Sequence, residues 1–490
     1  MVLIIIPFIA SLLTLLFNSK LAKIAAIAAS VVQLIVNFIL LYGFNTKAMV
    51  MQYASSYTWF TNLDLNFSTG IDGIAMVMLL LTNIASVLII VSTWDNQYSG
   101  TCKFLSLVLI MQGALNGVFL STNGLMFYIF WELALIPIYF IVGIWGGDNR
   151  LKITFKFFIY TFLGSLLMLL ALIFVYLHTP GNHSFEWSEM IKADLTGYEA
   201  TLILWAFFIA FAIKMPVFPF HTWQADTYNV APAQGSMLLS GIMLKMGIFG
   251  MIRWMWPMSK SSVGCNCNIY MLYNVFIILA VIGIIYAAII AIKQNDIKRV
   301  IAWSSVSHVG LIAAGIMTWT KEGLQGGILQ SFNHGINVIG LFFIAEIIDR
   351  RLKTRDIKEM GGLAKYGKTL ALFFMIIMLG SVAAPFTNGF TGEFLLLNAT
   401  FNYHQVLGIV SGLTIIFCAV YMLRVYQFSM FGPEKDNGGR IGKLSWSEFL
   451  TLGIIVVLVI TVGFFPNLIL DISESSVDGI LTQMKGGIAK

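Results

Sequence analysis

Long apolar segments recur along this chain from one end to the other, and they restrict it to one kind of fold. Each is roughly 17–25 residues long, the length that an α-helix needs to cross the hydrocarbon core of a bilayer. Hydrophobic residues make up 58% of the sequence and charged residues 11%, against the ~25% charged residues of a typical soluble domain. We therefore predict an all-α polytopic membrane protein, because the residue alternation of a membrane β-barrel is absent.

Fourteen segments are expected to cross the membrane, and together they form one membrane domain over residues 1–490. The expected spans lie at about residues 2–18, 21–43, 72–93, 102–120, 123–145, 154–178, 199–221, 233–257, 270–292, 299–318, 325–348, 369–398, 405–430 and 448–470. The polar stretches between them are too short to hold a separate soluble domain.

Lysine and arginine are unevenly divided between the two sets of loops. Of the 29 such residues, 19 follow odd-numbered helices, 6 follow even-numbered helices, and 4 lie within the spans. The positive-inside rule then predicts cytoplasmic odd-numbered loops and both termini on the outward side. The net charge of +6 is explained by this topology. No basic run with interleaved aromatic residues indicates a nucleic-acid partner.

Two of the expected helices are interrupted. Helix 7 is broken directly after Lys214 by Pro216 and Pro219, and helix 12 is interrupted over residues 380–393 around Pro385. The two breaks are five helices apart, which predicts inverted five-helix repeats formed by helices 4–8 (residues 102–257) and helices 9–13 (residues 270–430). Ion sites in such folds form on the discontinuous helices. The alternative is that each proline only kinks its helix.

Ionisable residues lie inside the apolar spans, although a charge at the bilayer centre costs at least ~2.5–3.5 kcal/mol. They occur at roughly one per helix, which favours a polar path across the bundle over a compact metal site. The candidate site residues are Glu132, Lys214, Lys245, His308, His334 and Glu393, with His221 just after the helix 7 break. Arg253 and Glu346 lie near helix ends, and we interpret them as residues that snorkel or pair with loops.

These residue types suit proton transfer. Burial disfavours the charged form of a lysine and a nearby carboxylate favours it, so a movement of Glu132 relative to Lys214 would switch the lysine between proton-holding and proton-releasing states. Histidines relay protons because imidazole both donates and accepts near neutral pH. The alternatives are a static ion pair between Glu132 and Lys214, ordinary hydrogen-bonded interior histidines, and a scaffold whose buried charges only hold subunits together.

The sequence carries no motif for a cofactor or a metal. It contains no Walker loop, no Gly-rich dinucleotide motif after a strand, no haem motif and no iron–sulfur spacing. The four cysteines, Cys102, Cys265, Cys267 and Cys418, form no metal or redox pattern. We expect neither a cofactor nor a metal in this chain.

Several longer motifs surround the candidate residues: Phe130-Trp131-Glu132-Leu133-Ala134-Leu135-Ile136-Pro137, Trp145-Gly146-Gly147, Lys214-Met215-Pro216 with His221-Thr222-Trp223, Gly241-Ile242-Met243-Leu244-Lys245, Ala302-Trp303-Ser304-Ser305-Val306-Ser307-His308, and Gly389-Phe390-Thr391-Gly392-Glu393. Through these motifs the chain resembles the antiporter-like membrane subunits of respiratory complex I over about residues 70–430. One segment departs from the family pattern, because Ala383-Ala384-Pro385 replaces an expected Gly-x-Pro.

The resemblance implies roles for the candidate residues. Glu132 and Lys214 would form the switching ion pair, Lys245 would be the central proton carrier, and Glu393 the terminal carrier toward the periplasmic exit. His308 and His334 would be relay groups, and His221 is a further relay candidate.

The same resemblance implies a multi-pass subunit of a bacterial inner membrane. NADH, FMN, Fe–S clusters and quinone would bind to partner subunits. Its neighbours would be other membrane subunits of complex I, including antiporter-like ones, and the lipid bilayer. A subunit of a multisubunit cation/proton antiporter and a subunit of a membrane-bound hydrogenase are alternatives within the same fold.

Overall fold

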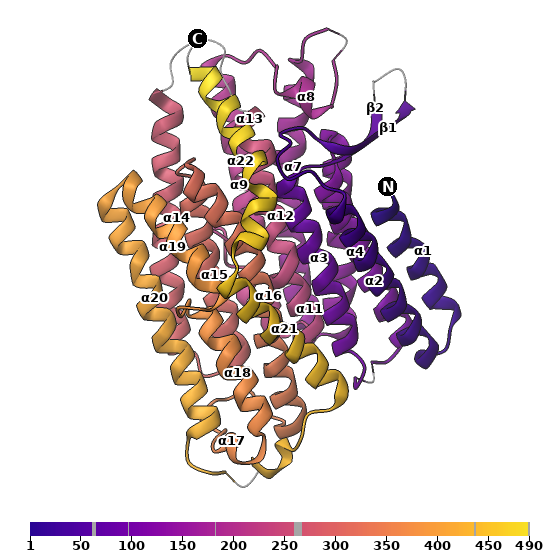
Figure 1. Cartoon of the computed structure of the whole chain (residues 1–490), viewed down its shortest axis with the longest axis vertical. Helices are drawn as coiled ribbons and strands as arrows, with labels where there is room; N and C mark the ends of the chain where they lie inside the picture. The colour runs from indigo at the N-terminus through magenta and orange to yellow at the C-terminus, as the bar shows by residue number, and fades with distance from the viewer. Residues whose placement is uncertain (61–64, 97, 182, 259–266, 436–437, 489–490) are drawn as a thin grey trace.

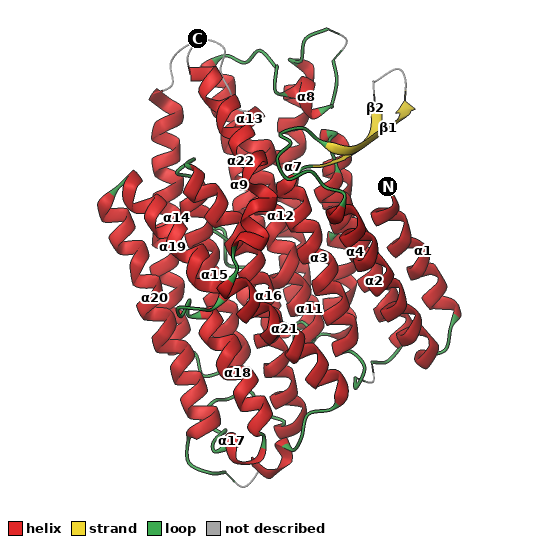
Figure 2. Cartoon of the chain, in the orientation of Figure 1, coloured by secondary structure: helices red, strands yellow, loops and turns green. Residues whose placement is uncertain are grey.

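The computed structural model describes residues 1–60, 65–96, 98–181, 183–258, 267–435 and 438–488. Most of this part of the chain is helical, and its long helices lie side by side in one bundle (Figure 1, Figure 2). Twelve helical segments in it are long and apolar enough to cross a membrane, and α1 and α18 are shorter apolar helices at two further expected spans. The polytopic helical fold is confirmed. The number of fourteen crossings stays a prediction.

The helices of the N-terminal half follow the expected spans closely. They are α1 (Val2–Leu16), α2 (Ser19–Tyr42), α3 (Gly73–Ser92), α4 (Thr101–Leu120), α5 (Gly124–Leu133), α6 (Leu135–Trp145), α7 (Arg150–Leu177), the short α8 (Trp187–Met190), α9 (Gly197–Lys214), α10 (Gln224–Val230), and one irregular helix made of α11 (Ala233–Leu238), η2 (Leu239–Met243), α12 (Leu244–Gly250), η3 (Met251–Met255) and α13 (Trp256–Met258).

The C-terminal half also consists mostly of long helices. Its elements are α14 (Cys267–Lys293), α15 (Ile297–Ile316), α16 (Lys321–Leu352), the short α17 (Leu363–Tyr366), α18 (Lys368–Ser381), α19 (Asn388–Tyr403), α20 (Gln405–Tyr426) continued by η4 (Gln427–Phe431), η5 (Gly438–Ile441), α21 (Trp446–Phe464) and α22 (Asn467–Ile488).

Two elements were not expected from the sequence. An antiparallel hairpin, β1 (Gln52–Phe60) and β2 (Leu65–Ile71), precedes α3 at one end of the bundle (Figure 2). The second unexpected element is helix α22. The expected fourteenth span ends at Phe464 instead of residue 470, because the chain turns at Pro466 and continues as α22. Helix α22 packs along α3 and α16, and Lys321 at the start of α16 pairs with its Glu474 and Asp478.

Both expected interruptions are present. Helix α9 ends at Lys214, and α10 starts ten residues later at Gln224. Helix α18 ends at Ser381 and α19 starts at Asn388.

A third interruption was missed, because the expected span 123–145 divides at Ala134 into α5 and α6. Pro137 lies three residues beyond and cannot donate a main-chain hydrogen bond to the preceding turn. The bounds and opposite senses of the two repeats stay predictions.

The most deeply buried helices are the irregular helix α11–α13 and α16. They cross at Gly241 and Gly335, where a Cβ on Gly335 would lie 2.8 Å from the Gly241 oxygen. Only glycine permits this approach, a familiar device of helix packing in membranes. The two helices that carry Lys245 and His334 are thereby held in direct contact at the centre of the bundle.

The N-terminus and the C-terminal end of α22 lie toward the end of the bundle that also carries the β1–β2 hairpin and α8 (Figure 1). Helix α17 lies at the opposite end, together with the basic segment between α16 and α18. We call this end the α17 end. This arrangement agrees with the expectation that both termini share one side. Which side faces the cytoplasm stays a prediction.

The helix 12 break suggests a stabilising substitution. Ala383 has a φ of 58°, in the left-handed region, which costs an L-residue roughly 1–2 kcal/mol. Glycine removes this strain but loses about 0.4–1 kcal/mol through the freedom of the unfolded chain. We expect Ala383→Gly to raise the free energy of unfolding by up to about 1 kcal/mol, measured as a higher thermal-unfolding midpoint of the assembled complex. Ala384→Gly, whose φ is not positive, is the control and should lower it. An equal loss in both variants would contradict the strain.

Candidate functional site

Lys245 occupies the most buried position of the site. It is 0% exposed and follows the π-helical segment η2, a type of irregularity that is frequent at functional sites. Its Nζ donates to the main-chain oxygen of Ser240 at 2.7 Å and lies 3.0 Å from Nδ1 of His334. Among the described residues, no carboxylate lies within ion-pair distance of Lys245. An imidazole, not an acid, is therefore the side-chain partner of this amine.

Three further candidate residues continue from Lys245 in a row. The ring centroids of His334 on α16 and His308 on α15 are 5.9 Å apart. Nδ1 of His308 lies 3.0 Å from Oε1 of Glu393 on α19. The structure thus brings Lys245, His334, His308 and Glu393 together in one chain of polar groups, which we call the central polar row. The second oxygen of Glu393 is buried and has no hydrogen-bond partner in the described structure.

Two residues that sequence reasoning missed also contact this row. Sγ of Cys418 on α20 lies 3.3 Å from Nε2 of His308, and Gln330 Nε2 donates to Glu393 Oε1 at 3.2 Å. A single cysteine in an apolar helix carries no spacing signal. The pattern that indicates it is a buried stripe of small polar residues one turn apart, Ser411, Thr414 and Cys418.

Glu132 and Lys214 lie in a second buried group that is not joined to the row by a direct contact. Lys214 is 2% exposed, and its Nζ has no hydrogen-bond partner. It lies 5.2 Å from the ring centroid of Trp131, within the range of a cation–π interaction. One oxygen of Glu132 is likewise buried without a partner. The expected ion pair is therefore open in this structure, although the two charges still act on each other through space.

The remaining candidate, His221, is separate from both groups. It is buried among the aromatic rings of Phe218, Tyr286 and Trp303, and its Nδ1 has no partner. Its relay role stays a prediction.

Within the described residues no cluster of three or more His, Cys, Asp or Glu side chains is arranged to hold a metal ion. Cys265 and the side chain of Cys267 lie outside the described part of the chain.

The two charged residues near helix ends pair as expected. Arg253 forms a buried ion pair with Asp72, which precedes α3. Glu346 near the end of α16 accepts hydrogen bonds from Asn96, in the loop after α3, and from Gln234 on α11.

Comparisons with known proteins identify the family. The family model described as "NADH:quinone oxidoreductase/Mrp antiporter, TM" matches residues 121–418. NADH-quinone oxidoreductase subunit M of Rickettsia prowazekii is 37% identical over 97% of this chain and 97% of the relative. A chain of respiratory complex I from Thermus thermophilus is 26% identical, with a TM-score of 0.89 and 98% of each chain covered. A chain of the Mrp complex from Dietzia shares the fold, at 17% identity with a TM-score of 0.85 over 100% of this chain and 98% of that one.

The burial of Lys245 yields a prediction about stability. A buried ammonium without a carboxylate partner carries a desolvation cost that a methionine of similar shape does not. We expect Lys245→Met to keep or raise the thermal-unfolding midpoint of the assembled complex. Lys321→Met is the control, because it removes a partly exposed lysine that is paired with two acidic residues. It should lower the midpoint slightly. A large loss of stability in Lys245→Met would show that the lysine has a structural role.

Proposed function

The chain belongs to the family of NADH:quinone oxidoreductase and Mrp antiporter membrane subunits, and from this membership we propose that it is the antiporter-like, proton-translocating membrane subunit of an NADH:quinone oxidoreductase. It corresponds to subunit M, the name of the Rickettsia relative. The motifs Leu135-Ile136-Pro137 and Trp145-Gly146-Gly147 favour the same subunit. Its task is to couple NADH oxidation and quinone reduction in partner subunits to proton pumping.

The central polar row is the observation that supports proton translocation best. Lys245 holds a proton, His334 accepts it on one ring nitrogen and releases another from the second, and His308 passes it on in the same way. The ring separation of 5.9 Å between the histidines leaves room for a bridging water. Glu393 is the terminal acceptor. Gln330 positions this carboxylate through its hydrogen bond, and Cys418 positions the His308 ring through its contact with Nε2.

Glu132 and Lys214 act as the switch on this row. Two unit charges 4 Å apart interact by about 4 kcal/mol at an effective dielectric constant near 20, so closing the open pair would strongly favour the charged form of Lys214. The coupling is also mechanical, because α9 and α12 are in close contact. A Cβ on Gly247 would lie 2.4 Å from Met215 Cγ and 3.4 Å from Lys214 Cβ. A displacement of Lys214 is therefore transmitted to the helix of Lys245.

The redox chemistry belongs to partner subunits on this proposal. NADH, FMN, Fe–S clusters and quinone bind there, and this chain contributes no redox centre. Its direct partners are other membrane subunits, including neighbouring antiporter-like ones, and the lipid of a bacterial inner membrane, with both termini periplasmic. His221 serves as a further relay group at the helix 7 break. The alternatives of a multisubunit cation/proton antiporter and a membrane-bound hydrogenase share the fold, but the name of the Rickettsia relative supports the oxidoreductase.

Replacement of Lys245 tests the proton path. We expect Lys245→Met to assemble and to lower proton pumping per NADH oxidised in sealed membrane vesicles by about tenfold or more, since a positioned proton carrier contributes factors of about 10²–10⁴. The measurement is proton uptake alongside NADH–quinone turnover, with Lys321→Met as the matched control. Normal pumping by an assembled Lys245→Met complex would support the scaffold alternative and contradict the pump.

Replacement of Glu132 tests the switch. Glu132→Gln removes the charge but keeps the size of the side chain, so the field that attracts Lys214 disappears. We expect coupled quinone reduction to fall severalfold while assembly stays normal. Glu322→Gln, at the exposed first turn of α16, makes the same chemical change outside the bundle interior and should have no effect. Unchanged turnover in both variants would leave Glu132 with at most a static role.

A further inference from the structure

A second polar contact joins the same two central helices at the α17 end. Glu346 Oε2 accepts from Gln234 Nε2 at 2.9 Å, as His334 contacts Lys245 at 3.0 Å nearer the middle of the bundle. Gln234 and Lys245 are eleven residues apart on the irregular helix, and Glu346 and His334 are twelve apart on α16. The two contacts therefore lie about 16–18 Å apart along antiparallel helices. Glu346 and Lys245 therefore belong to the same interface between these two helices.

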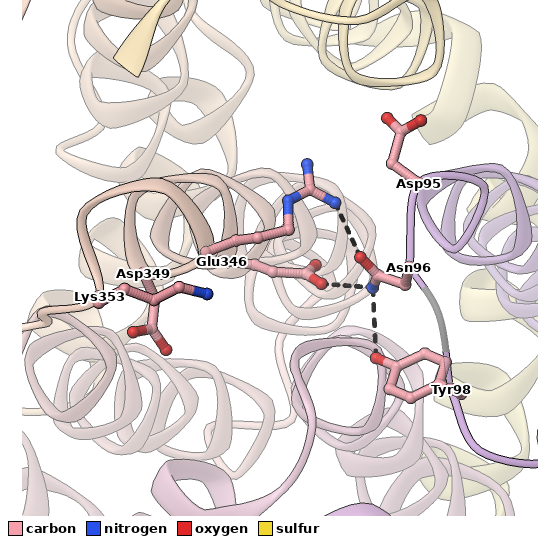
Figure 3. A pocket seen from close by; sticks show the side chains of 7 residues that line it. Asp95, Asn96, Tyr98, Glu346, Asp349 and Lys353 are labelled. Carbon is pink, nitrogen blue, oxygen red and sulfur yellow. Dashed lines mark hydrogen bonds between the residues drawn. The ribbon is translucent and has the colours of Figure 1, made fainter. Parts of the chain in front are cut away.

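Glu346 lies beside two cavities at the α17 end of the bundle. It lines two cavities of about 410 and 400 Å³, and its side chain is partly exposed. Asn96 donates to its Oε1 and lies within 3.3 Å of the Tyr98 hydroxyl (Figure 3). The Tyr98 hydroxyl donates to Gln234. Burial and the nearby Glu346 carboxylate raise the pKa of Tyr98, so this hydroxyl stays a donor. Two uncharged amide donors, Asn96 and Gln234, thus hold a partly exposed carboxylate in place, and Tyr98 in turn donates to Gln234.

The surroundings of Glu346 suit a proton and not a metal cation. Both carboxylate oxygens accept N–H groups, whereas Ca²⁺, Mg²⁺ and similar ions require several oxygen ligands. Arg350 reaches the same cluster through its hydrogen bond to Asn96, and Lys298 lines the neighbouring cavity. Two cationic side chains beside the carboxylate repel a metal ion, but they allow a proton to be taken up and released.

A polar side chain lies on the way from Glu346 to Lys245. Phe342, one turn from Glu346 on α16, contacts the ring of Tyr228 at 6.0 Å between centroids. The Tyr228 hydroxyl is buried, faces the side chains of Gln224 and Ser240, and makes no hydrogen bond of normal geometry in the described structure. Ser240 in turn accepts from Lys245 through its main-chain oxygen. A buried hydroxyl without a partner is a position at which an ordered water is expected.

We propose that Glu346 is the proton-collecting carboxylate that supplies Lys245, and that the hydroxyls of Tyr228 and Ser240, with intervening water, carry the proton inward. Glu346 takes one proton from cavity water and releases one to the first water of the path. Each hydroxyl accepts one proton as it gives one away, and the neutral amine of Lys245 becomes an ammonium. Glu346 returns to its carboxylate form for the next cycle. This inference rests on the proposed proton pump and adds its entry.

The test compares two carboxylates of the same cavity in the assembled complex. Glu346→Gln keeps both neighbouring amide contacts possible but cannot exchange a proton. Asp349→Asn makes the same charge change one turn further along α16, where the side chain points away from Asn96 and Tyr98 (Figure 3). We expect Glu346→Gln to lower coupled proton pumping about tenfold, Asp349→Asn to leave it within about twofold of the parent, and Glu346→Asp to recover most of it.

The outcomes separate this inference from the function on which it rests. If Lys245→Met loses pumping while an assembled Glu346→Gln complex pumps like the parent, the collecting role is wrong and the pump remains. If neither variant loses pumping, both are wrong. An equal loss in Glu346→Gln and Asp349→Asn would assign the effect to the charge of the cavity and also overturn the proposal. Should Glu346→Gln not assemble, Tyr228→Phe decides: a severalfold loss supports the path, and parental pumping contradicts it.

Discussion

The contact between Lys245 and His334 is the interaction on which the rest of the site depends. A fully buried amine without a polar partner carries a large desolvation cost, so a hydrogen-bond partner inside the protein stabilises it. Here the partner is an imidazole, which exists without charge at neutral pH and which can take the proton that the lysine gives up. A carboxylate in its place would hold the lysine proton in a stable ion pair. The glycine crossing at Gly241 and Gly335 keeps the two side chains within reach, so helix packing sets the contact on which the proposed proton transfer depends.

Four of the proposed groups, Glu132, Lys214, Lys245 and Glu393, lie beside a break in regular helix. Glu132 precedes the division at Ala134, Lys214 ends α9, Lys245 follows η2, and Glu393 begins the second turn of α19. A continuous helix satisfies its own main-chain groups and offers none to a side chain. An interrupted one frees groups such as the Ser240 oxygen, which binds the Lys245 amine. It also lets the two halves of a helix shift relative to each other, which a switch requires.

A helix break or a site residue can be predicted from the sequence where a local pattern has a single physical explanation. Charges within apolar runs and prolines beside them indicated the helix 7 and helix 12 breaks, and the row from Lys245 to Glu393 has the residues that were expected. Helix α22 was missed because one of its sides is polar, so its sequence lacks an uninterrupted apolar run. Glu474 and Asp478 lie on this polar side and form ion pairs with Lys321. The importance of Glu346 depends on a contact between residues 112 positions apart. No local pattern records such a contact, and the same is true of Cys418 and His308.

The structure also has a feature that a pump needs and a simple channel does not. A proton path open at both ends would dissipate the gradient, since each charge returns about 2.3 kcal/mol per 100 mV. Two buried oxygens without hydrogen-bond partners, the Tyr228 hydroxyl and Oε2 of Glu393, lie on either side of the pair formed by Lys245 and His334 along the proposed path. On the proposed function the direct contacts are thus interrupted before Lys245 and after Glu393. Water entering at either oxygen would connect one side at a time, and the open pair of Glu132 and Lys214 is placed to decide which.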